Sequence, residues 1–199
     1  MADSDLKEKR KEQIFEAALH CFNETGYDKT SIDSIAGKAA LSKGCLFHYF
    51  KTKHDLFLEL FFYRVNKYFD QMKAYIKKED SPEDRLRTLV HKAAYFLKEN
   101  EDFYKFCLEF LSMGVRDHQI RRIMTDFYKS SVGTFREIID DGVKTGRFQK
   151  DLDREKTARA FYLLVMGVFF TYFSVNVDFD IFEQQDYQLN RIIEGIERA

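Results

Sequence analysis

Only one proline, Pro82, occurs among 199 residues, and this scarcity restricts the possible folds more than any other feature of the sequence. Turns between short strands often need proline and glycine, yet the chain has one proline and nine glycines. Apolar residues make up 45% of the chain, which is enough for a well-buried core at this length. We therefore expect an all-α protein made of long helices.

Helix start and stop signals divide the chain into about nine predicted helices. The first ends at Gly26, because glycine accepts the left-handed backbone of a helix C-terminus. Side-chain oxygens are expected to cap the following helices at Thr30 with Asp33, at Ser42, and at Thr52 with Asp55. The predicted ranges are 9–25, 30–39, 42–50, 52–78, 81–98, 100–114, 117–145, 153–175 and 182–198.

The predicted helix over residues 52–78 is long enough to connect two separate bodies. Three helices are predicted before it and five after it. We therefore predict a small domain of residues 1–52 and a larger domain of residues 53–199.

Charge and cysteine usage limit the kind of protein this is. A net charge of −1 argues against a surface that is basic all over, so affinity for nucleic acid would need a local basic patch. Cys21, Cys45 and Cys107 are too widely spaced for a disulfide framework, and no histidine motif for zinc or iron occurs. The amino-terminal residues are charged from the start and do not resemble a secretory signal. These features predict a cytoplasmic protein without a metal or cofactor.

Residues 160–177 form an eighteen-residue stretch without charge, which reaches the lower limit for a membrane-spanning helix. The stretch also contains Thr171, Ser174 and Asn176, and charged sequence flanks it. A helix that is apolar on all sides is more often buried between other helices. We therefore expect no association with a membrane.

Residues 30–50 have the layout of a helix-turn-helix, in which two short helices are joined by a tight link at Ala40 and Leu41. Leu46 and Phe50 are four residues apart and share the inner face of the second helix. The opposite face is left free to meet a partner, and it carries Gly44, Cys45 and His48, with Phe47 at its margin.

The same region contains a local basic patch. Within residues 1–55 the charges cancel, nine basic against nine acidic, yet residues 36–53 contain four lysines and no acid. Lysine side chains bind phosphate, and Gly44 has no side chain to hold a duplex away from the backbone. The patch of Lys38, Lys43, Lys51 and Lys53 therefore supplies the donors that binding of nucleic-acid phosphate needs.

Residues 14–57 resemble the DNA-binding head of the TetR family of bacterial transcriptional regulators. The hallmarks are the segments FNETGYDKTSIDSIA and SKGCLFHYFKTKHDLF. The resemblance implies an all-α homodimer with a small head and a larger helical body that binds a small molecule. It also implies a repressor that the small molecule releases from DNA.

Carried onto this sequence, the resemblance makes residues 42–49 the recognition helix. Its major-groove contacts would be Lys43, Gly44, Cys45 and Phe47, and its contacts to the phosphate backbone would be Thr30, His48, Tyr49 and Lys53. Ala40 stands where the family usually has a glycine, so a left-handed backbone there would be strained. Cys45 and Phe47 also depart from the usual residues, which affects the operator sequence more than binding itself.

The body resembles the family in length, helix order and aromatic content. By analogy, the last two helices pair with their copies in a second subunit, through Phe161, Val165, Val168, Phe169, Tyr172, Leu189 and Ile193. The analogy also places a ligand pocket among the helices of the body, lined by Phe62, Asn66, Phe69, Phe103, Cys107, Phe127 and Tyr162. Aromatic walls would favour an apolar or aromatic effector.

The predicted function is therefore a homodimeric, sequence-specific repressor that a small apolar or aromatic effector releases from a near-palindromic operator. Two alternatives from other classes remain. A helical enzyme would need a catalytic constellation, and the sequence contains neither a G-x-S-x-G motif nor a phosphate-binding loop. A helical adaptor would bind another protein through the aromatic face of residues 42–50. Oxidation of Cys45 could switch DNA binding, although a small residue that merely fits the groove is the better explanation.

Overall fold

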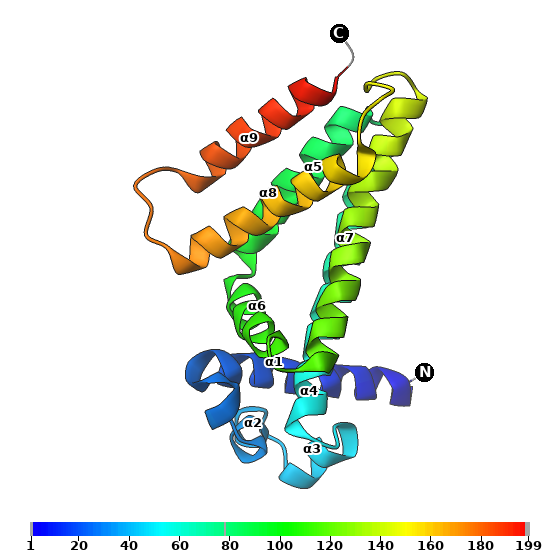
Figure 1. The fold of residues 1–199 in the computed structure, drawn as a ribbon. Helices are drawn as coiled ribbons and strands as arrows, with labels where there is room; N and C mark the ends of the chain where they lie inside the picture. Colours follow the sequence, from blue (N-terminus) through cyan, green and yellow to red (C-terminus); the bar gives the residue numbers. More distant parts are fainter. Residues whose placement is uncertain (1, 78, 198–199) are drawn as a thin grey trace. The chain divides into compact units, whose positions relative to one another are not determined.

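The computed structural model describes residues 2–77 and 79–197 and confirms the all-α prediction (Figure 1). A single isolated bridge between Phe148 and Glu197 is the only β pairing in these residues. The nine helices of the described residues are α1 (Ala2–Lys29), α2 (Ile32–Lys38), α3 (Lys43–Tyr49), α4 (Lys53–Tyr75), α5 (Pro82–Glu99), α6 (Glu101–Gly114), α7 (His118–Lys144), α8 (Arg154–Ser174) and α9 (Ile181–Ile196).

Most helices begin where the sequence predicted a cap. Ser42 Oγ accepts the N–H of Cys45 at 3.1 Å, and Thr52 Oγ1 accepts the N–H of Asp55 at 3.0 Å. Each bond satisfies one of the N–H groups that a helix start leaves without a partner. The corresponding caps of α5 and α8 are Ser81 and Asp153, as predicted.

The predicted cap of α2 at Thr30 is wrong, because the cap is the next residue, Ser31. Ser31 Oγ accepts the N–H of Ser34 at 3.0 Å, and Ser34 Oγ accepts the N–H of Ser31 at 3.1 Å. These reciprocal bonds form a capping box, in which two free N–H groups are satisfied together. The hydroxyl of Thr30 is left for a different role.

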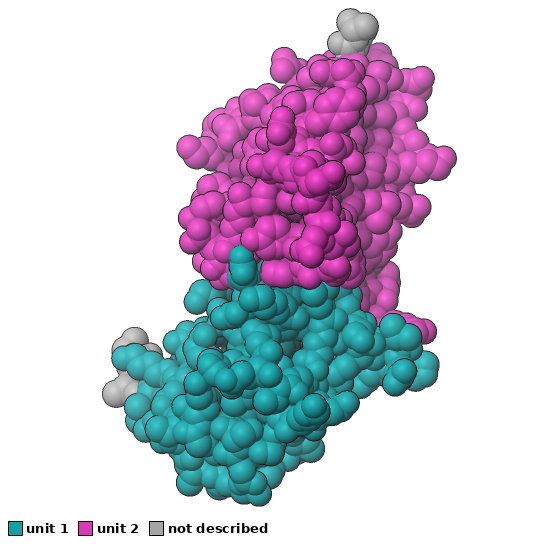
Figure 2. Space-filling view, turned by 90° about the vertical axis from the view of Figure 1, so that its left-hand side faces the viewer, with its two compact units in different colours: residues 1–69, 101–120 teal, residues 70–100, 121–199 magenta. Residues whose placement is uncertain are grey.

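The chain packs as two compact units (Figure 2). Unit 1 comprises residues 1–69 and 101–120, and unit 2 comprises residues 70–100 and 121–199. Unit 1 therefore contains α1 to α3 together with most of α4 and all of α6. The division of function at residue 52 stays a prediction.

The core of unit 1 is a cluster of phenylalanine rings from α1, α4 and α6. Phe57 meets Phe22 at 5.1 Å and Phe106 at 4.8 Å between ring centroids. Phe61 and Phe110 stack at 3.9 Å. All five rings are buried, and pairs of this kind add to the stabilisation that burial alone provides. The cluster therefore packs α6 against α1 and α4.

In unit 2, α5 packs against α8 and α9, which also pack against each other. The turn after α7 is closed by Phe148, which is fully buried. The N–H groups of Arg147 and Phe148 both donate to the carbonyl of Gly142, at 2.9 and 3.0 Å. A β-carbon on Gly142 would lie 2.1 Å from the Phe148 ring, so the ring occupies the space that a side chain would need.

Ala40 has a φ of 52°, so the strained left-handed backbone expected at this position is confirmed. We expect Ala40→Gly to stabilise the protein by about 1 kcal/mol, because a left-handed residue with a β-carbon costs about 1–2 kcal/mol. Part of that gain is offset by the greater entropy of glycine in the unfolded chain. Urea unfolding would measure the change.

The matched control is Ala39→Gly, because Ala39 is right-handed with a φ of −75° and its methyl group is buried. Glycine there is expected to destabilise the protein. Equal effects of the two substitutions would contradict strain at Ala40.

Candidate functional site

Helix α3 presents one side to solvent and buries the other. Leu46 and Phe50 are 1% and 2% exposed, whereas Phe47 is 45% exposed even though it is a large apolar residue. The structure brings the predicted contact residues together here, with Lys43, Gly44, Phe47 and His48 exposed and Cys45 and Tyr49 partly exposed. An exposed helix with a cation, an apolar ring and an imidazole on one side suits the major groove of DNA, which is wide enough for a helix.

The lysines of the basic patch differ in whether their ammonium groups have partners within the protein. Lys43 Nζ lies 2.8 Å from Asp33 Oδ2, and Lys38 Nζ lies 3.0 Å from His20 Nε2. Lys51 is exposed. Because exposed ion pairs contribute little and are screened by salt, a phosphate can displace Asp33 from Lys43 at small cost. The patch therefore remains available to a polyanion.

Lys53 has partners inside its own protein, different from the phosphates that the sequence predicted for it. Its ammonium donates to the carbonyls of Tyr27 at 2.6 Å, Thr30 at 2.8 Å and Asp28 at 3.3 Å. The same nitrogen lies 4.3 Å from the centroid of the Tyr27 ring. An ammonium has three N–H groups, and these three carbonyls occupy all of them.

The prediction that Thr30 contacts DNA is corrected, because this residue is only 3% exposed. Its hydroxyl lies 2.7 Å from the carbonyl of Gly26 and 3.0 Å from that of Cys21, so its one proton is shared between two carbonyls near the end of α1. The exposed hydroxyl at the start of α2 belongs to Ser31. The Ser31-x-x-Ser34 spacing was the signal that sequence reasoning missed.

The three cysteines have different environments. Burial raises the pKa of the thiols of Cys21 and Cys107, which disfavours their reactive thiolate forms. Cys45 is partly exposed in the first turn of α3. A redox role for Cys45 stays a hypothesis.

The predicted ligand-binding residues divide between the units. In unit 1, Phe103 is 9% exposed and packs against Phe61 and Phe106. The others retain accessible surface, with Phe62 and Asn66 exposed on α4 and Phe69 and Cys107 partly exposed in unit 1, and Phe127 and Tyr162 partly exposed in unit 2. A pocket lined by these seven stays a prediction.

Four of the seven residues predicted for the dimer interface lie in the core of their own unit. Their exposed fractions are too small for contact with a second copy, because none exceeds 4%, and they are Phe161, Phe169, Leu189 and Ile193. Val168 is 6% exposed and lines a groove between α8 and α9. Val165 and Tyr172 remain partly exposed. The sequence therefore did not indicate which side of these apolar helices faces outward, and a dimer interface on them stays a prediction.

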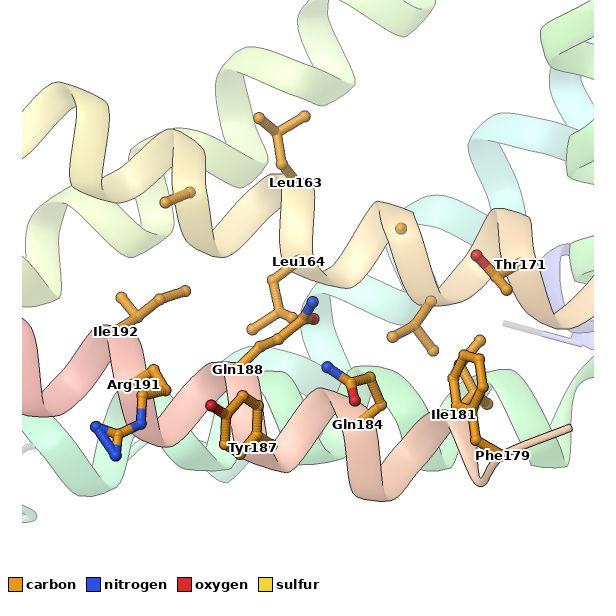
Figure 3. A pocket seen from close by; sticks show the side chains of 13 residues that line it. Leu163, Leu164, Thr171, Phe179, Ile181, Gln184, Tyr187, Gln188, Arg191 and Ile192 are labelled. Carbon is orange, nitrogen blue, oxygen red and sulfur yellow. The ribbon is translucent and has the colours of Figure 1, made fainter. Parts of the chain in front are cut away.

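The outward side of α8 and α9 contains a groove of about 570 Å³ (Figure 3). Leu163, which is 64% exposed, lies on α8, and Tyr187, which is 61% exposed, lies on α9. Large exposed apolar surfaces mark sites of interaction. The complete lining is Ala160, Leu163, Leu164, Gly167, Val168, Thr171, Phe179, Ile181, Gln184, Tyr187, Gln188, Arg191 and Ile192.

Two other kinds of site were tested on the described part of the chain. No group of three or more His, Cys, Asp or Glu side chains in residues 2–77 and 79–197 is arranged to hold a metal ion. Within the same ranges, α8 is the one helix long and apolar enough to cross a membrane. This is weak evidence for a span, because a helix in the core of a soluble protein meets the same test.

Two family profiles match the chain. Residues 14–60 match the bacterial regulatory proteins of the tetR family, and residues 82–186 match the C-terminal part of the BetI-type transcriptional repressors. The fatty acid metabolism regulator protein of Bacillus subtilis (strain 168) is 21% identical over 193 residues, covering 96% of this chain and 98% of the relative.

Solved structures show the same fold. FadR from Bacillus subtilis, in complex with stearoyl-CoA, has a TM-score of 0.79 at 21% identity and covers 93% of this chain and 98% of its own. A transcriptional regulator from Saccharomonospora viridis, in complex with choline, has a TM-score of 0.81 at 22% identity, covering 96% of this chain and 100% of its own.

Proposed function

Because this chain belongs to the tetR family of bacterial regulatory proteins, which are DNA-binding regulators of transcription, we propose that it is a repressor that a small molecule releases from its operator. The observation that carries the proposal is the exposed side of α3, which presents Lys43, Phe47 and His48 beside the basic patch. Base edges in the major groove would be read by this side. The exposed lysines of the patch would supply contacts to phosphate.

Recognition of DNA by a short helix such as α3 favours a homodimer. One helix of seven residues reads only a few base pairs, whereas two copies related by a two-fold axis read successive major grooves about 34 Å apart. The groove between α8 and α9 supports the dimer. Only 28% of the apolar eighteen-residue stretch of α8 is buried within the protomer, so most of this stretch is left for a second copy to cover. The operator would then be a near-palindrome, read in the cytoplasm where bacterial DNA lies.

We propose an apolar or aromatic effector. The partly exposed aromatic side chains of the predicted pocket, Phe69, Phe127 and Tyr162 among them, favour an apolar ligand. The Bacillus subtilis neighbour was solved with stearoyl-CoA, whose acyl chain is apolar, and this supports the same class. The neighbour from Saccharomonospora viridis was solved with choline, which is a cation. Cations are therefore the alternative class of effector to test.

The test is selection of bound duplexes from a random pool, followed by the salt dependence of the selected duplex. We expect a palindromic site whose affinity falls steeply with salt, because each neutralised phosphate releases counterions. Long-chain acyl compounds and choline would then be compared for release of the protein from that site. A protein that is folded and dimeric yet enriches no site would contradict the proposed function.

A further inference from the structure

The direction in which α2 leaves α1 depends on residues 26–30, which we call the α1–α2 link. Gly26 departs from helical geometry with a φ of 78° and a ψ of 163°, so the chain turns at this residue. Helix α2 begins shortly afterwards, at Ile32. Because α2 packs against both α1 and α3, the position of the link helps to set how α3 is presented.

Two charged side chains from other helices hold this link. Glu109, on α6, accepts the N–H of Tyr27 through Oε1. Lys53, on α4, donates to the carbonyls of Tyr27, Asp28 and Thr30. The carboxylate therefore binds the donor of Tyr27 while the ammonium binds the acceptor of the same residue.

Glu109 also lies beside Gly26, whose backbone conformation favours glycine. A β-carbon on Gly26 would lie 3.4 Å from Glu109 Oε1, and the positive φ is one that other residues rarely adopt. The carboxylate thus lies against the bare α-carbon of the link. The contact between Glu109 and the link therefore depends on the backbone geometry of the turn at Gly26, and not on attraction between charges alone.

The surroundings of Tyr27 strengthen both interactions. Its ring lies 4.7 Å from Phe57 and 5.8 Å from Phe22, and burial raises the pKa of its hydroxyl. Hydrogen bonds to charged groups are stronger than neutral ones, and removing one partner leaves the other without compensation in a partly dry site. Loss of either charge should therefore loosen the link.

We propose that Lys53 and Glu109 are positioning residues, which clamp the α1–α2 link from both sides and thereby hold α2 and α3 in the orientation that binds DNA. Lys53 acts through the link and not through a phosphate, because a phosphate contact would leave three carbonyls without their donor. The part of this proposal that concerns DNA rests on the proposed function.

The first test is independent of DNA. In the full-length protein, amide hydrogen exchange of a peptide spanning the link is compared for the wild type, Lys53→Met, Glu109→Ala and Lys51→Met. We expect exchange at the link to accelerate about tenfold or more in Lys53→Met and Glu109→Ala, since local opening controls exchange. It should not change in Lys51→Met, because Lys51 is exposed. Unchanged exchange in both clamp variants would overturn the clamp.

The second test separates positioning from phosphate contact. Loss of a phosphate contact lowers the slope of log affinity against log salt by about one, as we expect for Lys51→Met. Lys53→Met should lower operator affinity about tenfold or more with the slope unchanged, because the lost interaction lies within the protein. A slope reduced by about one, together with unchanged exchange at the link, would show that Lys53 contacts phosphate and would sink the proposal.

If Lys53→Met does not fold, the conservative variant Lys53→Arg still tests the proposal. Arginine preserves the charge but not the compact three-carbonyl geometry, so Lys53→Arg should lower affinity with the slope unchanged. A phosphate contact would instead tolerate arginine, and full affinity in Lys53→Arg would contradict positioning. If the wild type binds no duplex, the proposed function fails, while the exchange experiment still decides whether the clamp exists.

Discussion

We expect the substitution Gly142→Ala to destabilise the protein by about 1–3 kcal/mol, although alanine is the better helix former. The added β-carbon would lie 2.1 Å from Cδ2 of Phe148 and 2.3 Å from its Cε2. These atoms belong to a ring that is fully buried, so the ring cannot swing into solvent without losing its packing. Either the ring or the end of α7 must move. Urea unfolding monitored by circular dichroism would measure the loss.

A matched control lies on the same helix. Gly133 has nothing within 4 Å of its hypothetical β-carbon, so Gly133→Ala should stabilise the protein by about 0.5–1 kcal/mol. Stability changes of opposite sign in Gly142→Ala and Gly133→Ala would distinguish the steric clash from the effect of helix propensity. Phe148→Ala should cost about 3–5 kcal/mol, and Gly142→Ala should cost less in that background, because the truncated ring leaves room. Additive effects would contradict the clash.

We expect Leu163→Glu to convert a dimer into a monomer and to lower operator affinity by roughly a hundredfold or more, because a monomer presents one recognition helix where the operator has two half-sites. Leu163 is 64% exposed in the protomer and lines the groove between α8 and α9. Burying a glutamate in the proposed apolar interface is costly unless the charge is paired. Light scattering and binding to the selected duplex would measure both effects.

The control for Leu163→Glu is Val115→Glu. Val115 is 68% exposed, lies in the chain between α6 and α7, and is not among the residues that line the groove. The same charge there should leave the oligomeric state unchanged. A Leu163→Glu protein that remains a dimer with full affinity for DNA would show that the groove is not the interface.

Local features of the fold were predictable because their causes lie within a few residues. The caps at Ser42, Thr52 and Ser81 are hydrogen bonds to residues three positions later. The outward side of α3 follows from the helical period, which places Phe47 and His48 away from Leu46. The strain at Ala40 followed from the family resemblance, since the residue stands where glycine is usual.

Helix α8 shows where the periodic pattern gave no answer. Its residues are apolar on every side, so the sequence contains no polar stripe that marks the outward face. Phe161 and Phe169 were expected outside and are buried, whereas Leu163 and Phe170 are the exposed members. The packing of α5, α7 and α9 against α8 decides which side is covered.

The sequence by itself determined the helices, most of their caps, the exposed side of α3 and the family, because these depend on contacts within a few residues or on an ordered motif. Only the tertiary structure decided the partners of Thr30, Lys53 and Glu109. Lys53 meets the carbonyl of Tyr27 across 26 positions of sequence, and Glu109 meets its N–H across 82. A side chain that can reach either solvent or a distant backbone group is directed by the packing that brings that group near, and no local pattern encodes it.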